Sequence, residues 1–186
     1  MTLNITKASN RTGQQLLMAG SFNLQDTTSA FGTDIVTLTI NGDPLGEADQ
    51  INIEMWGKHT STQHDVQLQI AVKSLSGVSF TDILNTTNLS ITANQNYLWR
   101  VNLVEDLGNT DQMDADGHSW NGAGTDDGSA IANQSAYRNT EILSDANFMA
   151  KKMTLRLSAC LSSTISSSGD SIINYKVFRV PSGGSD

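Results

Sequence analysis

The sequence is poor in several residue types that define common protein classes. It has one cysteine, two prolines and a charged fraction of only 16%, against roughly 25% in an ordinary domain. A single cysteine excludes an internal disulfide and a cysteine-based zinc site. The 11 basic residues are outnumbered by 19 acidic ones, which argues against general binding to nucleic-acid phosphates. No apolar run approaches the roughly 18 residues of a membrane span.

Recognisable catalytic motifs are also missing. The sequence has no G-x-S-x-G nucleophile elbow and no H-E-x-x-H zinc motif. His59 and His64 lie close together in an expected hairpin connection, but no Cys or Glu completes a zinc set at helical spacing beside them. We therefore expect a protein that is not an enzyme.

What the sequence has in abundance is uncharged polar residues and a two-residue hydrophobic period. Ser, Thr, Asn and Gln make up more than a third of the chain. Where apolar and mostly polar residues alternate, a strand places one face on a core and the other outward. Such segments cover residues 34–40, 51–56, 66–72, 97–103, 153–161 and 173–180, with shorter candidates at 18–24 and 89–92.

This pattern predicts an all-β fold of about eight strands. Few segments suit helices, and the best of them are residues 81–84, as one turn, and a short helix within 129–149. Parallel strands need crossovers of a dozen or more residues, which are usually helical, so most strands should pair antiparallel. We predict an antiparallel two-sheet sandwich that resembles a jelly roll.

The chain is expected to form one domain over residues 1–180, with an N-terminal arm at 1–12 and a tail at 181–186. Residues 105–150 are predicted to be one long irregular loop, rich in Gly, Asn and acidic residues. Seven acidic residues and no Lys or Arg fall within 101–137, so most of the net charge of -8 lies there. A loop of this length is typical of functional or partner-ordered segments.

The acidic segment holds the candidate cation site of the sequence. Asp111, Asp114 and Asp116 are closely spaced carboxylates, with Asp126 and Asp127 available as further ligands. Ca²⁺ is the expected ion, since it takes six to eight oxygen ligands. The segment does not match an EF-hand loop, because it lacks the Glu at the twelfth position. The alternative is a solvated loop whose Asp and Asn side chains cap their own turns.

Four residues are candidates for contact with a partner. Trp56 has the opposite phase to the apolar residues of its strand, and Trp120 lies within the acidic segment. Such aromatic residues anchor subunit contacts, although they also pack under loops or stack on sugars. Leu3 and Ile5 alternate with polar residues in the N-terminal arm, which is suited to adding a strand to a partner's sheet edge.

In overall character the chain resembles the small β-sandwich decoration, or cement, proteins of phage and viral capsids. The resemblance rests on the low charge density, the abundance of Ser, Thr, Asn and Gln, the expected eight or so strands and the missing catalytic set. It implies a virion protein, made in the host cytoplasm, that forms homo-oligomers such as trimers and binds neighbouring capsid subunits. It implies no catalytic residues and no cofactor apart from the Ca²⁺ considered above.

Two other classes share this composition. One is an extracellular glycan-binding β-sandwich, calcium-dependent if the acidic segment holds the ion, in which Trp56 and Trp120 would lie exposed beside a concave polar face. The other is a phage tail-tube or fibre component, in which a long loop or arm inserts into the next ring. Burial of the two tryptophans between subunits would instead favour the capsid interpretation.

Overall fold

The computed structural model describes residues 4–5, 14–23, 33–40, 49–59, 64–85, 89–91, 95–105, 111–123, 133–143, 153–161 and 171–181. Within these ranges the chain forms twelve strands, and no helix there is long and apolar enough to cross a membrane. The strands are β1 (Asn4–Ile5), β2 (Gln15–Asn23), β3 (Thr33–Ile40), β4 (Gln50–His59), β5 (His64–Lys73), β6 (Thr81–Asn85), β7 (Leu89–Ile91), β8 (Gln95–Glu105), β9 (Gln112–Ala123), β10 (Asn133–Ile142), β11 (Met153–Leu161) and β12 (Ser171–Val180).

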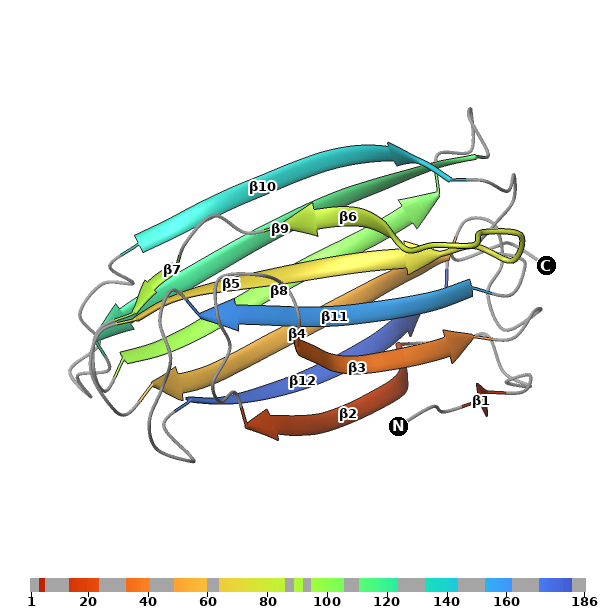
Figure 1. Ribbon diagram of the computed structural model, residues 1–186. Coiled ribbons are helices and arrows are strands. Elements are labelled where there is room, and N and C mark those ends of the chain that lie inside the picture. Colours follow the sequence, from red (N-terminus) through yellow and green to blue (C-terminus); the bar gives the residue numbers. More distant parts are fainter. Residues whose placement is uncertain are drawn as a thin grey trace.

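The strands form two six-stranded sheets (Figure 1). Sheet A has the order β1-β3-β11-β5-β6, with β7 also paired to β5, and sheet B has the order β10-β9-β8-β4-β12-β2. The short β1–β3 pair is parallel, and the other described pairs are antiparallel. The predicted antiparallel two-sheet architecture is confirmed.

The strand order is that of a jelly roll, which is one long antiparallel ribbon wound into two sheets. β2 pairs with β12, β3 with β11, β4 with β8 and β5 with β6. Successive rungs of this ribbon alternate between sheet B and sheet A. Seven of these eight strands were predicted; the eighth, β6, was not, and the remaining predicted strand at residues 89–92 is β7. The hairpin of β9 and β10 is an addition after β8 and widens sheet B by two strands.

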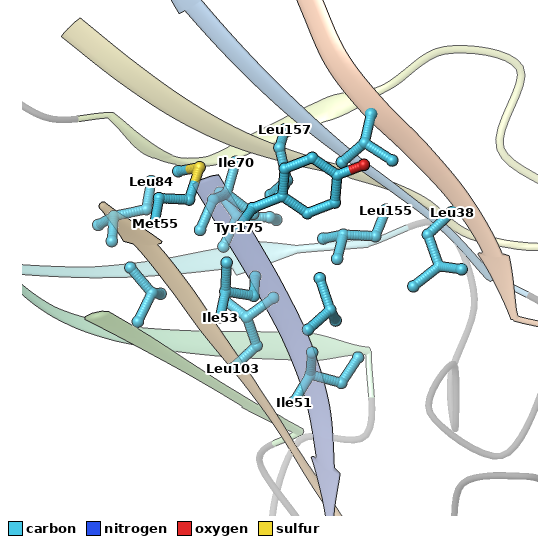
Figure 2. Close-up of a cluster of buried hydrophobic side chains, with 14 of the residues drawn as sticks. Leu38, Ile51, Ile53, Met55, Ile70, Leu84, Leu103, Leu155, Leu157 and Tyr175 are labelled. Atoms are coloured by element: carbon cyan, nitrogen blue, oxygen red, sulfur yellow. The ribbon is translucent and has the colours of Figure 1, made fainter. Parts of the chain in front are cut away.

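Alternate residues of the facing strands form a hydrophobic core between the sheets. Figure 2 shows Leu38, Ile70, Leu84, Leu155 and Leu157 of sheet A meeting Ile51, Ile53, Met55, Leu103 and Tyr175 of sheet B. Trp99 is fully buried among them, as its phase predicts. Burial of one such aliphatic side chain stabilises the fold by about 1.5–3 kcal/mol. The apolar residues at every second position of these strands therefore hold the two sheets together.

The prediction of one irregular loop over residues 105–150 is wrong, because β9 and β10 lie there in unbroken antiparallel register. Their inward-facing residues are too small or too polar to give an apolar stripe. On β9 the inward positions include Ala115, Gly117 and Ser119, which are buried. A Cβ added to Gly117 would lie 2.8 Å from Cδ2 of Leu84, so the small residues leave room for β6.

The two segments expected to be helical are also corrected. Residues 81–84 belong to β6, and much of 129–149 belongs to β10. In β6 the neighbours Ile83 and Leu84 are both buried, because the pairing of β6 with β5 shifts register there. Two adjacent buried apolar residues are not a two-residue period, so the segment did not give the signature of a strand.

The N-terminal arm pairs with its own chain where it is described. Ile5 lies opposite Ile40 in the parallel pair of β1 with β3. At this point the arm is the edge strand of sheet A of its own chain, and the role expected for Ile5 in a partner's sheet stays a prediction. Leu3 lies outside the described residues.

Candidate functional site: the outer face of sheet B

The outer face of sheet B spans six strands. On β4, β8, β9, β10 and β12 the odd-numbered residues turn toward the core, and the even-numbered residues form the outer face. On β2 a register shift against β12 changes this parity, and Leu16 and Ala19 lie beside the outer residues Phe178 and Lys176. The face is thus set by the same alternation that builds the core.

Charged side chains on this face are balanced. The described ones are Glu54, Asp114, Asp116, Arg100, Arg138 and Lys176. Nε of Arg100 lies 3.1 Å from Oε1 of Glu54, and Nε of Arg138 lies 3.8 Å from Oδ1 of Asp116. Exposed pairs of this kind stabilise a fold by only about 0–1 kcal/mol. Their main consequence is that the described charges of this face cancel.

Asp114 projects onto the outer face from β9, where its neighbours are neutral donors. Its Oδ1 accepts a hydrogen bond of 2.7 Å from Oγ1 of Thr140 and one of 3.5 Å from Nε2 of Gln112. Asp111 precedes the strand, and its main-chain oxygen accepts a hydrogen bond of 2.6 Å from the N–H of Leu143. The structure therefore uses Asp114 to join β9 to β10.

Asp116 lies beside the nitrogens of basic side chains rather than beside other carboxylates. Besides the contact with Arg138, its Oδ2 lies 4.0 Å from Nε2 of His118. Within the described ranges no three His, Cys, Asp or Glu side chains come together as a metal site would require. Asp126 and Asp127, the further ligands considered from the sequence, lie outside those ranges. The described part of the predicted Ca²⁺ site is thus not assembled as a set of ligands.

A polar depression of about 230 Å³ lies between β8, β9 and β10. Asn102, Asp114, Asp116, Arg138 and Thr140 contribute most of its polar lining. Pockets that bury small molecules typically hold roughly 300–1,000 Å³ and are mostly apolar. The depression is smaller and more polar than those pockets, which suits a hydroxyl-rich group or a protein side chain.

The two candidate tryptophans belong to one row across sheet B. In the register of the sheet, Trp120 of β9 and Trp56 of β4 both lie opposite Leu98 of β8. The side chain of Trp56 is half-buried on the outer face, with Nζ of Lys176 5.3 Å from the centre of its ring. A cation over the ring is an attractive contact and occupies one side of it. The side chain of Trp120 is not described.

Exposed apolar side chains complete the face, and the sequence did not single them out. Ile142 is 69% exposed on β10, Leu16 is 52% exposed on β2 and Ile172 is 44% exposed on β12. Ile142 lies in the segment predicted as a loop, and Leu16 precedes the strand expected at residues 18–24. Ile142 and Leu16 lie on the two edge strands of sheet B, and Ile172 immediately precedes the strand expected at residues 173–180.

Comparisons with known proteins add little to this geometry. No protein-family model matches the chain, and no curated protein matches it. Among solved structures, the chain is similar to one described as "Structure of infectious bursal disease virus Gt strain", with 12% sequence identity and a TM-score of 0.25. The match covers 92% of this chain and 42% of that chain. A likeness this slight carries no argument about function.

Proposed function

We propose that this chain is a non-enzymatic virion structural protein, a capsid decoration or cement protein that binds neighbouring subunits through the outer face of sheet B. The observation that carries the proposal is the character of that face. It extends over six strands, has balanced charges and mixes half-buried aromatic and aliphatic side chains with Asn, Gln and Thr. A depression of about 230 Å³ on this face is lined mainly by polar residues.

This character suits adhesion better than capture of a small ligand. Protein interfaces are enriched in aromatic residues at their centre and depleted of Lys, Glu and Asp relative to the rest of the surface. Trp56, Leu98 and Phe178 lie on the inner strands of sheet B. The charges of Arg100 and Glu54 on the same face compensate each other. A face whose described charges cancel gains little from electrostatic steering, so attachment would rest on contact area and on many copies acting together.

The fold is compatible with this function without deciding it. Jelly-roll sandwiches are common among viral capsid and lectin domains, and function is carried by sites rather than by folds. In the proposed role the protein is made in the host cytoplasm, forms homo-oligomers such as trimers and is carried on the virion.

The test is binding to particles. Virus particles that lack the chain are mixed with the purified protein and separated on a density gradient. The protein should sediment with the particles, and Leu98→Glu should lose this binding, because it places an unpaired charge at the centre of the face. Thr37→Glu is the matched control, since Thr37 is equally half-buried on the outer face of sheet A. A wild-type protein that stays at the top of the gradient contradicts the proposal.

The second candidate is a glycan-binding module, and the polar depression is the observation that favours it. Asn102, Asp116 and Arg138 supply amide, carboxylate and guanidinium groups of the kind that bind sugar hydroxyls. A panel of glycans should then show binding that is lost in Arg138→Gln and kept in Thr37→Glu. Sugar binding by a protein that does not bind particles would support this function in place of the first.

A further inference from the structure

β10 forms one edge of sheet B, and alternate residues of it present their main-chain groups away from the sheet. It is the outermost strand beside β9 in Figure 1. The hydrogen bond from Leu143 N to Asp111 O identifies the residues that bond to the β9 side. Since hydrogen-bonded and non-hydrogen-bonded pairs alternate in an antiparallel ladder, the odd-numbered residues of β10 bond to β9. The N–H and C=O groups of Ala136, Arg138, Thr140 and Ile142 therefore point outward.

This edge lacks the features that protect the other described edges. Natural sheets blunt their edges with very short strands, bulges, proline or lysine. β1 has 2 residues and β7 has 3, while β6 has 5 and a register shift. β2, at the far side of sheet B, also has a register shift. β10 has 10 residues in continuous register with β9 and contains neither proline nor lysine, and its charged residues are Arg138 on the outer face and Glu141 on the inward face.

The composition of β10 permits pairing with a second copy of itself. An antiparallel pair of identical strands is symmetric about one residue, and like charges directly opposite each other are destabilising. A two-fold axis at Arg138 or at Glu141 would oppose two like charges. With the axis at Asn139, Arg138 faces Thr140 of the other copy, and Ala136 faces Ile142. This register avoids both repulsions and covers Ile142, which is 69% exposed.

We propose that two copies of this chain join through their β10 strands, paired antiparallel about Asn139, so that the two B sheets become one continuous sheet. Four residues of each copy present an outward N–H and C=O in this register, which gives about eight main-chain hydrogen bonds. The outer faces of both B sheets then form one surface. A two-fold contact produces dimers, or pairs of any larger ring, and so links neighbouring oligomers.

The inference does not depend on the proposed attachment to particles. Self-association through β10 is a property of the purified protein, whereas capsid binding requires particles. Loss of one leaves the other intact, so the failures of the two proposals are distinguishable.

The first experiment is sedimentation velocity over a range of concentrations. Ala136→Pro removes an outward N–H without breaking the β9 ladder, because proline is tolerated at edge positions whose N–H faces away from the sheet. It should weaken dimerisation at least about tenfold. Ala136→Thr is the matched control, because it keeps the N–H at the same exposed position and should dimerise like the wild type. If Ala136→Pro does not fold, Ala136→Lys is used instead, because it places a charge opposite Ile142 of the other copy.

The second experiment locates the contact by amide hydrogen exchange in the wild-type protein. The amides of Ala136, Arg138, Thr140 and Ile142 should become protected as concentration rises, while that of Ala19 on β2 should not change. A protein that stays monomeric or strictly trimeric at high concentration overturns the proposal. Dimerisation that Ala136→Pro does not weaken, or concentration-dependent protection elsewhere than β10, overturns it as well.

Discussion

Arg179 and Asp49 form an ion pair in the interior of the protein, with side chains only 1% and 4% exposed. Nε and a terminal nitrogen of the guanidinium both donate to Oδ2 of Asp49, the first at 2.7 Å. Arg179 occupies a core-facing position of β12 opposite Ile51, and Asp49 immediately precedes β4. The pair therefore fixes the start of β4 to the end of β12.

Removing one partner of this pair should destabilise the fold strongly. Asp49→Ala leaves a buried guanidinium without its carboxylate, which typically costs about 3–5 kcal/mol. The double variant Asp49→Leu with Arg179→Met removes both charges and should recover most of that loss, because apolar replacements of buried ion pairs are often neutral or better. Urea unfolding of the three proteins measures both effects.

The control for this experiment is an ion pair on the outer face. Glu54→Gln breaks the contact with Arg100, and since both side chains are partly solvated the change should stay within about 1 kcal/mol. If Asp49→Ala costs no more than Glu54→Gln, the buried pair does not have the role given to it.

Gly57 is expected to resist even the smallest substitution. A Cβ at this position would run into the main-chain oxygen of Ile172 and the ring of Tyr97, which crosses over the glycine from β8. Gly57→Ala should therefore cost about 3 kcal/mol, the upper range for overpacking a core. Thermal and urea unfolding measure this cost.

Gly77→Ala is the matched control for Gly57→Ala. At Gly77 the nearest atom to an added Cβ is Oγ of Ser74, at 3.2 Å, and a side-chain hydroxyl can turn away. The cost there should stay below about 1 kcal/mol. Equal losses at the two positions would mean that the close approach of Tyr97 to Gly57 is not what requires glycine.

The sequence predicted the faces of the jelly-roll strands well, because their cores are made by large apolar residues. Trp99, Val101 and Leu103 alternate with Arg100 and Asn102 along β8, and all three apolar side chains are buried. The same holds for Ile51 and Ile53 of β4. Where burial alone determines which side chains face the core, a two-residue hydrophobic period is enough to predict the two faces of a strand.

The hairpin of β9 and β10 was not predicted, because its inward-facing residues are determined by contacts that the sequence does not reveal. On β10 the inward Asn139 donates through Nδ2 to the main-chain oxygen of Ile83 at 2.8 Å and to Oε1 of Glu141 at 2.9 Å. Polar residues thus face inward where β10 meets β6. The acidic residues that suggested a loop, Asp114 and Asp116, are the outward half of β9, and their partners come from β10.

Stability should fall at alkaline pH through Tyr175. Burial raises the pKa of its hydroxyl above the ordinary value of 10.0. The unfolded chain therefore ionises first as the pH rises. The contribution is fully present below about pH 10 and is lost as the pH rises through the folded-state pKa, at up to about 1.4 kcal/mol per pH unit.

Tyr175→Phe provides the test of this pH dependence. Urea unfolding at several values above pH 9 or so should show a shallower loss of stability in Tyr175→Phe than in the wild type, whatever their difference at neutral pH. Parallel curves for the two proteins would show that another group causes the alkaline loss.

Calcium is expected to have no effect on the melting temperature. Asp114 is hydrogen-bonded to Thr140 and Asp116 is paired with Arg138, and no set of three ligand side chains converges within the described ranges. An ion that bound the folded state would add about 2.7 kcal/mol at a hundredfold excess over its Kd, which is about 5–10 °C for a chain of this size. Calorimetry in millimolar Ca²⁺ and in EDTA separates the two cases. A rise of several degrees that Asp114→Asn with Asp116→Asn abolishes would restore the Ca²⁺ site predicted from the sequence, whereas a rise that survives both substitutions would place the ion elsewhere in the chain.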